Sequence, residues 1–252
     1  MKNNILLLLP LFLALMTTTA MAQDCTGNGF KKRLRVGYSL GATTPMGIPE
    51  EVREIKSYSP KNNLSFGLDI QKNLTGHIGV MIGLRVENKG MEADVDIKAY
   101  NMQELRKGTQ TLAGYFTGGV KIDVTQWMLT IPLMATFDTN RFQIHAGPYL
   151  SRALKHDFSG YAYDGYLRQD TPQGAKVNMG HSENDRGDYD LSSDLRDKQF
   201  GIMVGTDLQL LRHLGVFVDL SWGLTGIFED DFKTIEQTLY PIFGTVGAYF
   251  KF

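Results

Sequence analysis

Ten consecutive residues carry the pattern that decides the fold of this chain: Ile78-Gly79-Val80-Met81-Ile82-Gly83-Leu84-Arg85-Val86-Glu87. Large apolar residues occupy every second position, and Gly, Met, Arg and Glu lie between them. A period of two is typical of a β-strand, because successive side chains of a strand point to opposite faces. One face of this strand is therefore apolar, and the other is small or charged.

The same alternation recurs in seven further segments. They cover residues 34–42, 64–71, 127–135, 142–150, 200–209, 216–222 and 240–252. Short connections at 73–76, 137–141 and 211–213 alternate with long ones at 43–63, 88–125, 151–199 and 223–239. This asymmetry is typical of barrels in the bacterial outer membrane. The sequence therefore predicts an all-β, eight-stranded, antiparallel up-and-down transmembrane β-barrel with short periplasmic turns and long extracellular loops.

The apolar faces of the predicted strands carry no charged residue, as contact with lipid requires, because a buried Arg or Lys at the bilayer midplane costs about 2–4 kcal/mol. Aromatic residues near the strand ends fit interfacial girdles: Phe66, Trp127, Phe142, Phe200, Trp222, Tyr240, Phe250 and Phe252. A soluble barrel would carry many more charges on its second face. A soluble, lipocalin-like periplasmic barrel, with a ligand inside, is the alternative.

The second face predicts a polar network inside the barrel, since its few charges nearly cancel. Its members are Arg35, Asp69, Arg85, Glu87, His145, Asp207, Asp219 and Lys251. Bulky side chains on the same face would fill an eight-stranded lumen, which argues against a diffusive pore. They are Met81, Arg85, Met203, Phe217 and Tyr249.

Residues 1–22 have the features of a secretory signal peptide: Lys2, an apolar run over 5–16, and Ala20-Met21-Ala22 at the end. The run is too short for a membrane-spanning helix, and Pro10 interrupts it. We expect Sec export and cleavage near Ala22, a short periplasmic N-terminal segment over 23–33, and a barrel over 34–252. Cys25 follows the cleavage site and leaves a lipid anchor as an alternative.

The composition excludes several classes of protein. The chain has 252 residues, 26 Lys+Arg against 27 Asp+Glu, and a mean hydropathy of -0.19, which excludes a bundle of membrane helices and a disordered chain. The near-zero charge suggests no nucleic-acid partner. One cysteine cannot form an internal disulfide, and no Cys/His spacing fits zinc. We expect no cofactor and no metal ion.

Three features in the long connections admit a functional interpretation. His181-Ser182-Glu183 combines catalytic residue types, but consecutive side chains diverge and cannot form a triad. Acids that could bind calcium follow it, at spacings unlike an EF-hand: Glu183, Asp185, Asp188, Asp190, Asp194 and Asp197. Residues 103–107 fit a helical turn, whereas Leu112, Tyr115 and Phe116 could instead extend strands above the membrane.

The C-terminal residues resemble the insertion signal of outer-membrane barrels, with Thr245, Gly247, Phe250 and Phe252 at the matching positions. Residues 129–133, 145–150 and 221–227 resemble the PorT-like outer-membrane β-barrel family of Bacteroidetes, although Trp222 and Gly226 replace an expected Tyr and Asn. The first resemblance implies handling by the barrel-assembly machinery. The second implies an accessory role in a type IX-like secretion system as one function.

Together these patterns predict a non-enzymatic protein in the outer membrane of a Gram-negative bacterium. It would act as a membrane scaffold or through ligand or protein contacts of its extracellular loops, and it would contact outer-membrane lipid and lipopolysaccharide. A secretion accessory is the alternative function. A lipid-modifying enzyme has less support, because no strand-borne histidine has an evident nucleophile beside it.

Overall fold

A computed structural model describes residues 29–47, 49–229, 232 and 237–252 of the chain. The chain divides into two units, residues 1–30 and 31–252, and every described strand belongs to the second unit. The predicted signal peptide and Cys25 lie outside the described residues.

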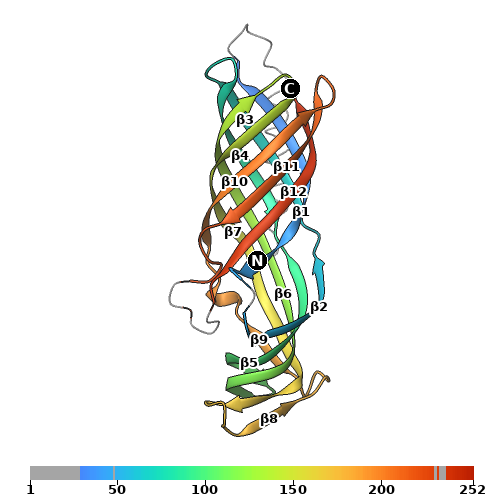
Figure 1. Cartoon of the computed structure of the whole chain (residues 1–252), viewed down its shortest axis with the longest axis vertical. Helices are drawn as coiled ribbons and strands as arrows, with labels where there is room; N and C mark the ends of the chain where they lie inside the picture. The colour runs from blue at the N-terminus through green and yellow to red at the C-terminus, as the bar shows by residue number, and fades with distance from the viewer. Residues whose placement is uncertain (1–28, 48, 230–231, 233–236) are drawn as a thin grey trace. The chain divides into compact units, whose positions relative to one another are not determined.

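Twelve strands form one antiparallel sheet (Figure 1). They are β1 (Lys31–Pro45), β2 (Val52–Pro60), β3 (Leu64–Asn73), β4 (Ile78–Asn88), β5 (Met91–Lys107), β6 (Gln110–Asp138), β7 (Phe142–Gln169), β8 (Lys176–Met179), β9 (Gly187–Asp190), β10 (Lys198–Gln209), β11 (Leu214–Gly223) and β12 (Leu239–Lys251). A single short 3₁₀ helix, η1 (Ser192–Asp194), is present among the described residues, and none of their helices is long and apolar enough to cross a membrane. The all-β, antiparallel prediction is confirmed.

A subset of the strands pairs in an order that returns to its start. β1 pairs with β3, β3 with β4, β4 with β6 and β6 with β7; β7 pairs with β10, β10 with β11, β11 with β12, and β12 with β1. These strands contain all the segments predicted from the alternation. We call this set of strands the ring.

Tight turns connect the ring strands at the end where the C-terminus lies. The amide of Leu74 donates to the carbonyl of Ile78 (2.8 Å), Thr139 donates to Phe142 (2.7 Å) and Leu210 donates to Leu214 (3.0 Å). The predicted short turns are therefore present. β1 starts at Lys31, which pairs with Gln71, so residues 31–33 belong to the strand and not to the N-terminal segment expected over 23–33.

Three of the long connections, over 43–63, 88–125 and 151–199, were expected to be loops but contain β-strands. We call β2, β5, β8, β9, residues 110–126 of β6 and residues 153–169 of β7 the extension. Figure 1 shows β5, β8 and β9 at one end of the sheet and the C-terminus at the other end. The helical turn expected over 103–107 is wrong, because these residues lie in β5, where Leu105 pairs with Leu112. The alternative, strands extended through Leu112, Tyr115 and Phe116, is confirmed.

Bulges explain why alternation did not reveal the extension. The register of β6 with β7 shifts between Thr117 and Gly119, and that of β5 with β6 shifts between Ile97 and Tyr100. Ala99, inside the second shift, has a φ of 55°. Each extra residue moves the following side chains to the opposite face, so a strict period of two is lost over such a strand.

The polarity of the two faces reverses along β6. Between Leu129 and Phe137 the exposed side chains are apolar, and Ile131 is 44% exposed while Thr130 is fully buried. Before Trp127 the order is opposite: the buried side chains are apolar and Lys121 and Asp123 lie on the other face. The buried apolar members of this segment are Leu112, Phe116, Val120 and Val124.

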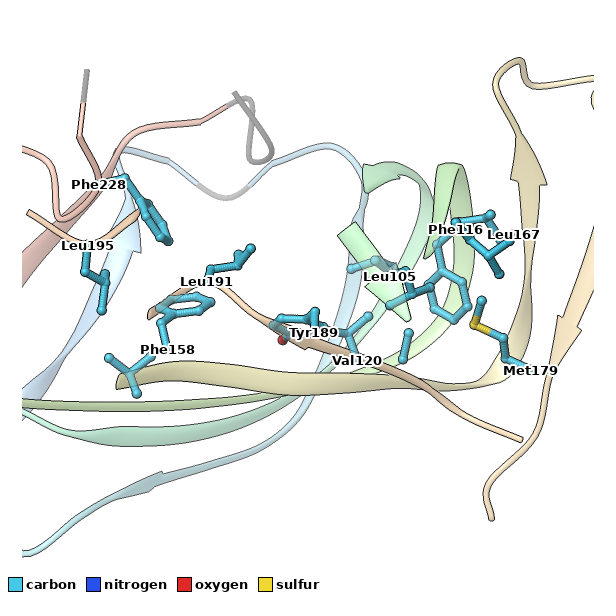
Figure 2. Close-up of a cluster of buried hydrophobic side chains, with 14 of the residues drawn as sticks. Leu105, Phe116, Val120, Phe158, Leu167, Met179, Tyr189, Leu191, Leu195 and Phe228 are labelled. Atoms are coloured by element: carbon cyan, nitrogen blue, oxygen red, sulfur yellow. The ribbon is translucent and has the colours of Figure 1, made fainter. Parts of the chain in front are cut away.

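The reversed faces enclose a hydrophobic core within the extension (Figure 2). Figure 2 shows Phe116, Leu167, Leu105 and Met179 packed together, and Phe158 near Phe228. The rings of Phe158 and Phe228 meet edge to face with centroids 5.2 Å apart. Burial of each such large side chain contributes about 1.5–3 kcal/mol, so the extension has its own source of stability.

We predict that Phe116→Ala destabilises the extension by about 3–5 kcal/mol, because Phe116 is fully buried and its removal leaves a cavity. Limited proteolysis should then cleave within residues 91–126 or 153–190, while the ring stays resistant. Tyr115→Ala, on the neighbouring half-buried position of the same strand, is the control and should remain resistant. Equal sensitivity of both variants would contradict a separate core.

Candidate functional site

A buried ion network occupies the inner side of the ring strands. Arg35 on β1 donates to Asp69 on β3 (Nη1 to Oδ2, 2.9 Å) and to Asp219 on β11 (Nη2 to Oδ2, 3.0 Å). Arg85 on β4 donates to the same Oδ2 of Asp219 at 2.7 Å. All four side chains are at most 5% exposed. The network thus joins strands that are distant in the pairing order.

The network continues toward the tight turns through a residue that the sequence analysis placed outside the barrel. Arg33 donates to Asp207 on β10 (Nη1 to Oδ2, 2.5 Å) and also to Gln71 and Gln143. Arg33 lies within residues 23–33, which were expected to form an N-terminal segment. The signal that could have found Arg33 is its position two residues before Arg35, on the same face of a strand.

The charges of this cluster cancel. Three arginines, at 33, 35 and 85, face three aspartates, at 69, 207 and 219. Charges taken out of water are tolerated only when they are paired and hydrogen-bonded. The network is therefore explained by the need to neutralise each buried charge, without a ligand.

His145 on β7 is fully buried and its Nε2 lies 2.8 Å from Oδ1 of Asp219. Donor atoms of His145, Asp207 and Asp219 lie within 4.8 Å of one another, a distance at which three groups could hold a metal ion. The same carboxylates already accept hydrogen bonds from Arg33, Arg35 and Arg85. A cation would have to displace these guanidinium groups, so the arrangement does not favour a metal.

Two predicted members of the network lie apart from this cluster. Glu87 pairs with Lys89 (2.9 Å) and accepts a hydrogen bond from Thr130 (2.7 Å). The ammonium of Lys89 lies 5.3 Å from the ring centroid of Tyr149. Lys251 is half-buried and makes no ion pair with a described residue.

Large side chains fill the rest of the inner face. The guanidinium of Arg35 stacks 3.8 Å above the ring of Phe217, and Met81, Met134, Tyr149 and Met203 form a buried cluster. Gly205 leaves room for the centre of the network, because a Cβ there would overlap Oδ1 of Asp219 and Nε2 of His145. The bulky residues predicted to block the lumen are buried on this face, with Tyr249 5% exposed.

The residues with a catalytic or calcium interpretation do not assemble into a site. Nδ1 of His181 lies 3.0 Å from Asp164, and both side chains are more than half exposed. Asp185 pairs with Lys107 (2.5 Å) and Asp188 with Arg186 (2.7 Å). Within the described part of residues 183–197, no three acids converge at metal-binding distance.

An apolar cavity of about 320 Å³ lies where the extension meets the ends of two ring strands, and the sequence did not predict it. Its walls come from the ends of β1 and β12 and from β2, β5, β6, β7 and the segment near β9. Its size falls in the range of about 300–1,000 Å³ that is typical of small-molecule sites. The cavity is assembled from strands whose bulges hide their alternation, so no local pattern indicated it.

Comparison with known proteins identifies the class. Residues 21–229 match the family described as outer membrane protein beta-barrel domain. This match covers most of the chain, so the chain belongs to that family, and outer-membrane localisation follows. No curated protein matches the chain.

Several solved structures of small outer-membrane proteins match the chain at low sequence identity. The attachment invasion locus protein Ail of Yersinia pestis, in complex with the heparin analogue sucrose octasulfate, is 10% identical over 88% of this chain and 99% of Ail, with a TM-score of 0.40. CarO2 of Acinetobacter baumannii is 13% identical over 87% of this chain and 98% of CarO2, with a TM-score of 0.40. Neisserial surface protein A is 8% identical over 90% of this chain and 100% of its own chain, with a TM-score of 0.36.

We predict that Asp219→Asn destabilises the protein by about 3–5 kcal/mol, because it leaves Arg35 and Arg85 buried with too little negative charge. Urea unfolding, followed by the change in gel mobility, measures the effect. Asp197→Asn is the matched control: its side chain is 66% exposed, and its loss should change stability by less than about 0.5 kcal/mol. A similar small effect for both variants would refute the neutralising role of Asp219.

Proposed function

We propose that this chain is a non-enzymatic outer-membrane protein whose ring of eight strands forms a closed transmembrane barrel and whose extension makes the functional contacts outside the cell. The observation that carries the proposal is the reversal of polarity along β6 near Trp127. A strand with an apolar outer face is suited to contact with lipid. A strand with an apolar inner face and a polar outer face is suited to contact with water. The reversal therefore supports a membrane boundary at this level.

The blocked interior supports a role other than transport. Eight strands enclose a space that side chains fill, and here the ion network and the aromatic rings lie in it. The tight turns and the C-terminus would face the periplasm, and the extension would face outward, as in other barrels with short turns on one side.

A non-enzymatic role is supported by the surroundings of the histidine inside the ring. A lipid-modifying enzyme would need a strand-borne histidine with a serine or an acid on a neighbouring strand. His145 has two acids beside it, Asp219 and Asp207 on the paired strand β10, but arginines already neutralise both carboxylates. The extension, with its own core, is the better candidate for contacts with a ligand or a protein.

Exposed side chains on the outer face of the protein suggest its partners during and after membrane insertion. Exposed apolar side chains such as Ile131 and Leu133 would contact outer-membrane lipid and lipopolysaccharide. Phe250 and Phe252 are exposed and would present the insertion signal to the barrel-assembly machinery. Gly247 also has a packing role, because a Cβ there would overlap the carbonyl of Val36.

An accessory role in a type IX-like secretion system is the second candidate. The resemblance to the PorT-like family suggests it, and the extension gives it a folded surface for a protein partner. Co-purification with secretion proteins would separate this role from that of an independent ligand-binding barrel. Membership in the PorT-like family stays a prediction.

The test of the proposed function is heat-modifiable migration of the protein from the outer-membrane fraction. Unboiled protein should migrate differently from boiled protein, as a closed barrel resists detergent. A membrane-impermeant amine reagent added to whole cells should label the exposed lysines of the extension, Lys98 and Lys176, and should spare Lys72 beside a periplasmic turn. A soluble protein without a mobility shift would contradict the barrel and favour a soluble periplasmic protein.

We predict that Leu133→Arg destabilises the lipid-inserted protein by about 2–4 kcal/mol, because the charge would enter the hydrocarbon region. Thr111→Arg, on the exposed face of the same strand within the extension, is the control. It should change stability by less than about 0.5 kcal/mol. Urea unfolding of both variants in lipid vesicles measures the difference, and equal effects would place the membrane boundary elsewhere.

A further inference from the structure

The apolar cavity of the extension has a lining without a single charged residue among the described residues. β5 supplies Met91, Ala93, Val95, Ile97 and Met102, and β2 faces them with Val52, Ile55 and Tyr58. A ligand with a carboxylate or phosphate inside would find no cation there. Burial of an unpaired charge is costly, so the lining selects for an uncharged molecule.

The tyrosines that line the cavity do not alter this conclusion. Burial raises the pKa of the Tyr189 phenol, so its hydroxyl stays neutral, and that hydroxyl donates to the carbonyl of Lys121 (2.9 Å). The Tyr58 hydroxyl donates to the carbonyl of Gly41, and this hydrogen bond links β2 to β1 along the cavity wall. These two polar groups are therefore already satisfied by the protein.

One polar group in the lining is not satisfied. Thr43 on β1 is 4% exposed, and its Oγ1 has no hydrogen-bond partner among the residues that the structure describes. Buried hydroxyls nearly always have a partner, because leaving one unpaired costs free energy. The Thr43 hydroxyl is therefore available to a hydroxyl, carbonyl or amine of a molecule in the cavity.

Other features of the cavity suit a small ligand. Two small residues, Ala42 and Ala93, leave space that larger side chains would fill, and Met91 and Met102 are flexible enough to adapt to different shapes. β2 forms one wall and, among the described residues, pairs with β5 alone, and its Ile55 is 56% exposed. An edge strand of this kind gives a ligand a path of entry.

We propose that this cavity binds an uncharged, mainly hydrocarbon molecule with one hydrogen-bonding group, whose body lies on β5 and whose polar group meets the Thr43 hydroxyl. The inference deepens the proposed function, since it names a ligand class for the extension. Its chemistry fits a free alcohol, phenol or ketone, or the neutral end of a lipid-derived molecule.

The test uses the full-length mature protein in phosphatidylcholine nanodiscs, with ¹³C-labelled methionine methyl groups. The probes are 1-naphthol, naphthalene and 1-naphthoate, which share a ring system and differ in polarity and charge. We expect 1-naphthol to shift the Met91 and Met102 signals saturably. The signals of Met81, Met134 and Met203, which are buried inside the ring, should not move and serve as internal controls.

The comparison among probes tests the ligand class. Naphthalene should bind about fivefold more weakly than 1-naphthol, which is the contribution of one hydrogen bond. 1-Naphthoate should bind at least about tenfold more weakly, because its charge has no partner in the cavity. Tighter binding of 1-naphthoate would overturn the assignment of an uncharged ligand.

Two substitutions with matched controls locate the site. Thr43→Val keeps the shape and removes the hydroxyl, so it should lower the affinity for 1-naphthol about fivefold without changing that for naphthalene. Thr111→Val, on an exposed position, should change neither. Ala93→Trp should fill the cavity and abolish binding of both, whereas Ala113→Trp, exposed on β6, should not.

The outcomes separate this inference from the proposed function. A sample that shows heat-modifiable migration but no saturable shift at Met91 and Met102 overturns the binding site and leaves the barrel intact. Equal, unsaturable shifts of all methionine signals would show partition of the probe into lipid and would also overturn it. Absence of the mobility shift would overturn the proposed function itself.

Discussion

The structure depends on one constraint: the outer face of the ring strands is apolar, so their polar side chains have to lie inside. Arg33, Arg35 and Arg85 then meet in a space closed to water, where each needs a carboxylate. Asp69 supplies one from β3, the neighbour of β1, and Asp207 and Asp219 supply the others from β10 and β11, which pair with neither β1 nor β4. The network that results joins strands across the inner side of the ring, where Phe217 and Tyr149 are also buried.

In the proposed arrangement, the extension follows from the same constraint, because its strands lie outside the lipid. In the part of β6 that precedes Trp127, the apolar side chains point inward. In β7, Phe158 and Leu167 are buried in the same way. The strands β6 and β7 therefore continue from the polar inner face of the ring into the hydrophobic core of the extension. Because the core rests on strands that the ring holds in register, the extension is an ordered scaffold and not a set of free loops. Such a scaffold can position the walls of a cavity, as Ala93 and Thr43 do from two different strands.

The ring and the cavity beside the extension offer different possibilities for binding. In the interior of the ring the charges cancel and the histidine faces Asp219, although some network atoms, such as Nε of Arg35 and Nδ1 of His145, have no hydrogen-bond partner among the described residues. The cavity instead leaves open apolar space beside an unpartnered hydroxyl, that of Thr43. The structural evidence for binding therefore lies in the extension, although the polar residues that attract attention in the sequence lie in the ring.

The sequence by itself determined the ring. Residues 78–87 and their repeats fixed the strands, the apolar face and the charged residues opposite it, because strand periodicity and the demands of lipid are both local. It did not determine the partners within the network, since Arg33 lies outside the expected strand and Lys251 has no ion pair among the described residues. It also did not reveal the extension, because bulges at Thr117 and Ile97 break the alternation. The cavity was decided only by the tertiary structure: its lining comes from strands far apart in sequence, and whether the hydroxyl of Thr43 finds a partner depends on what those strands place around it.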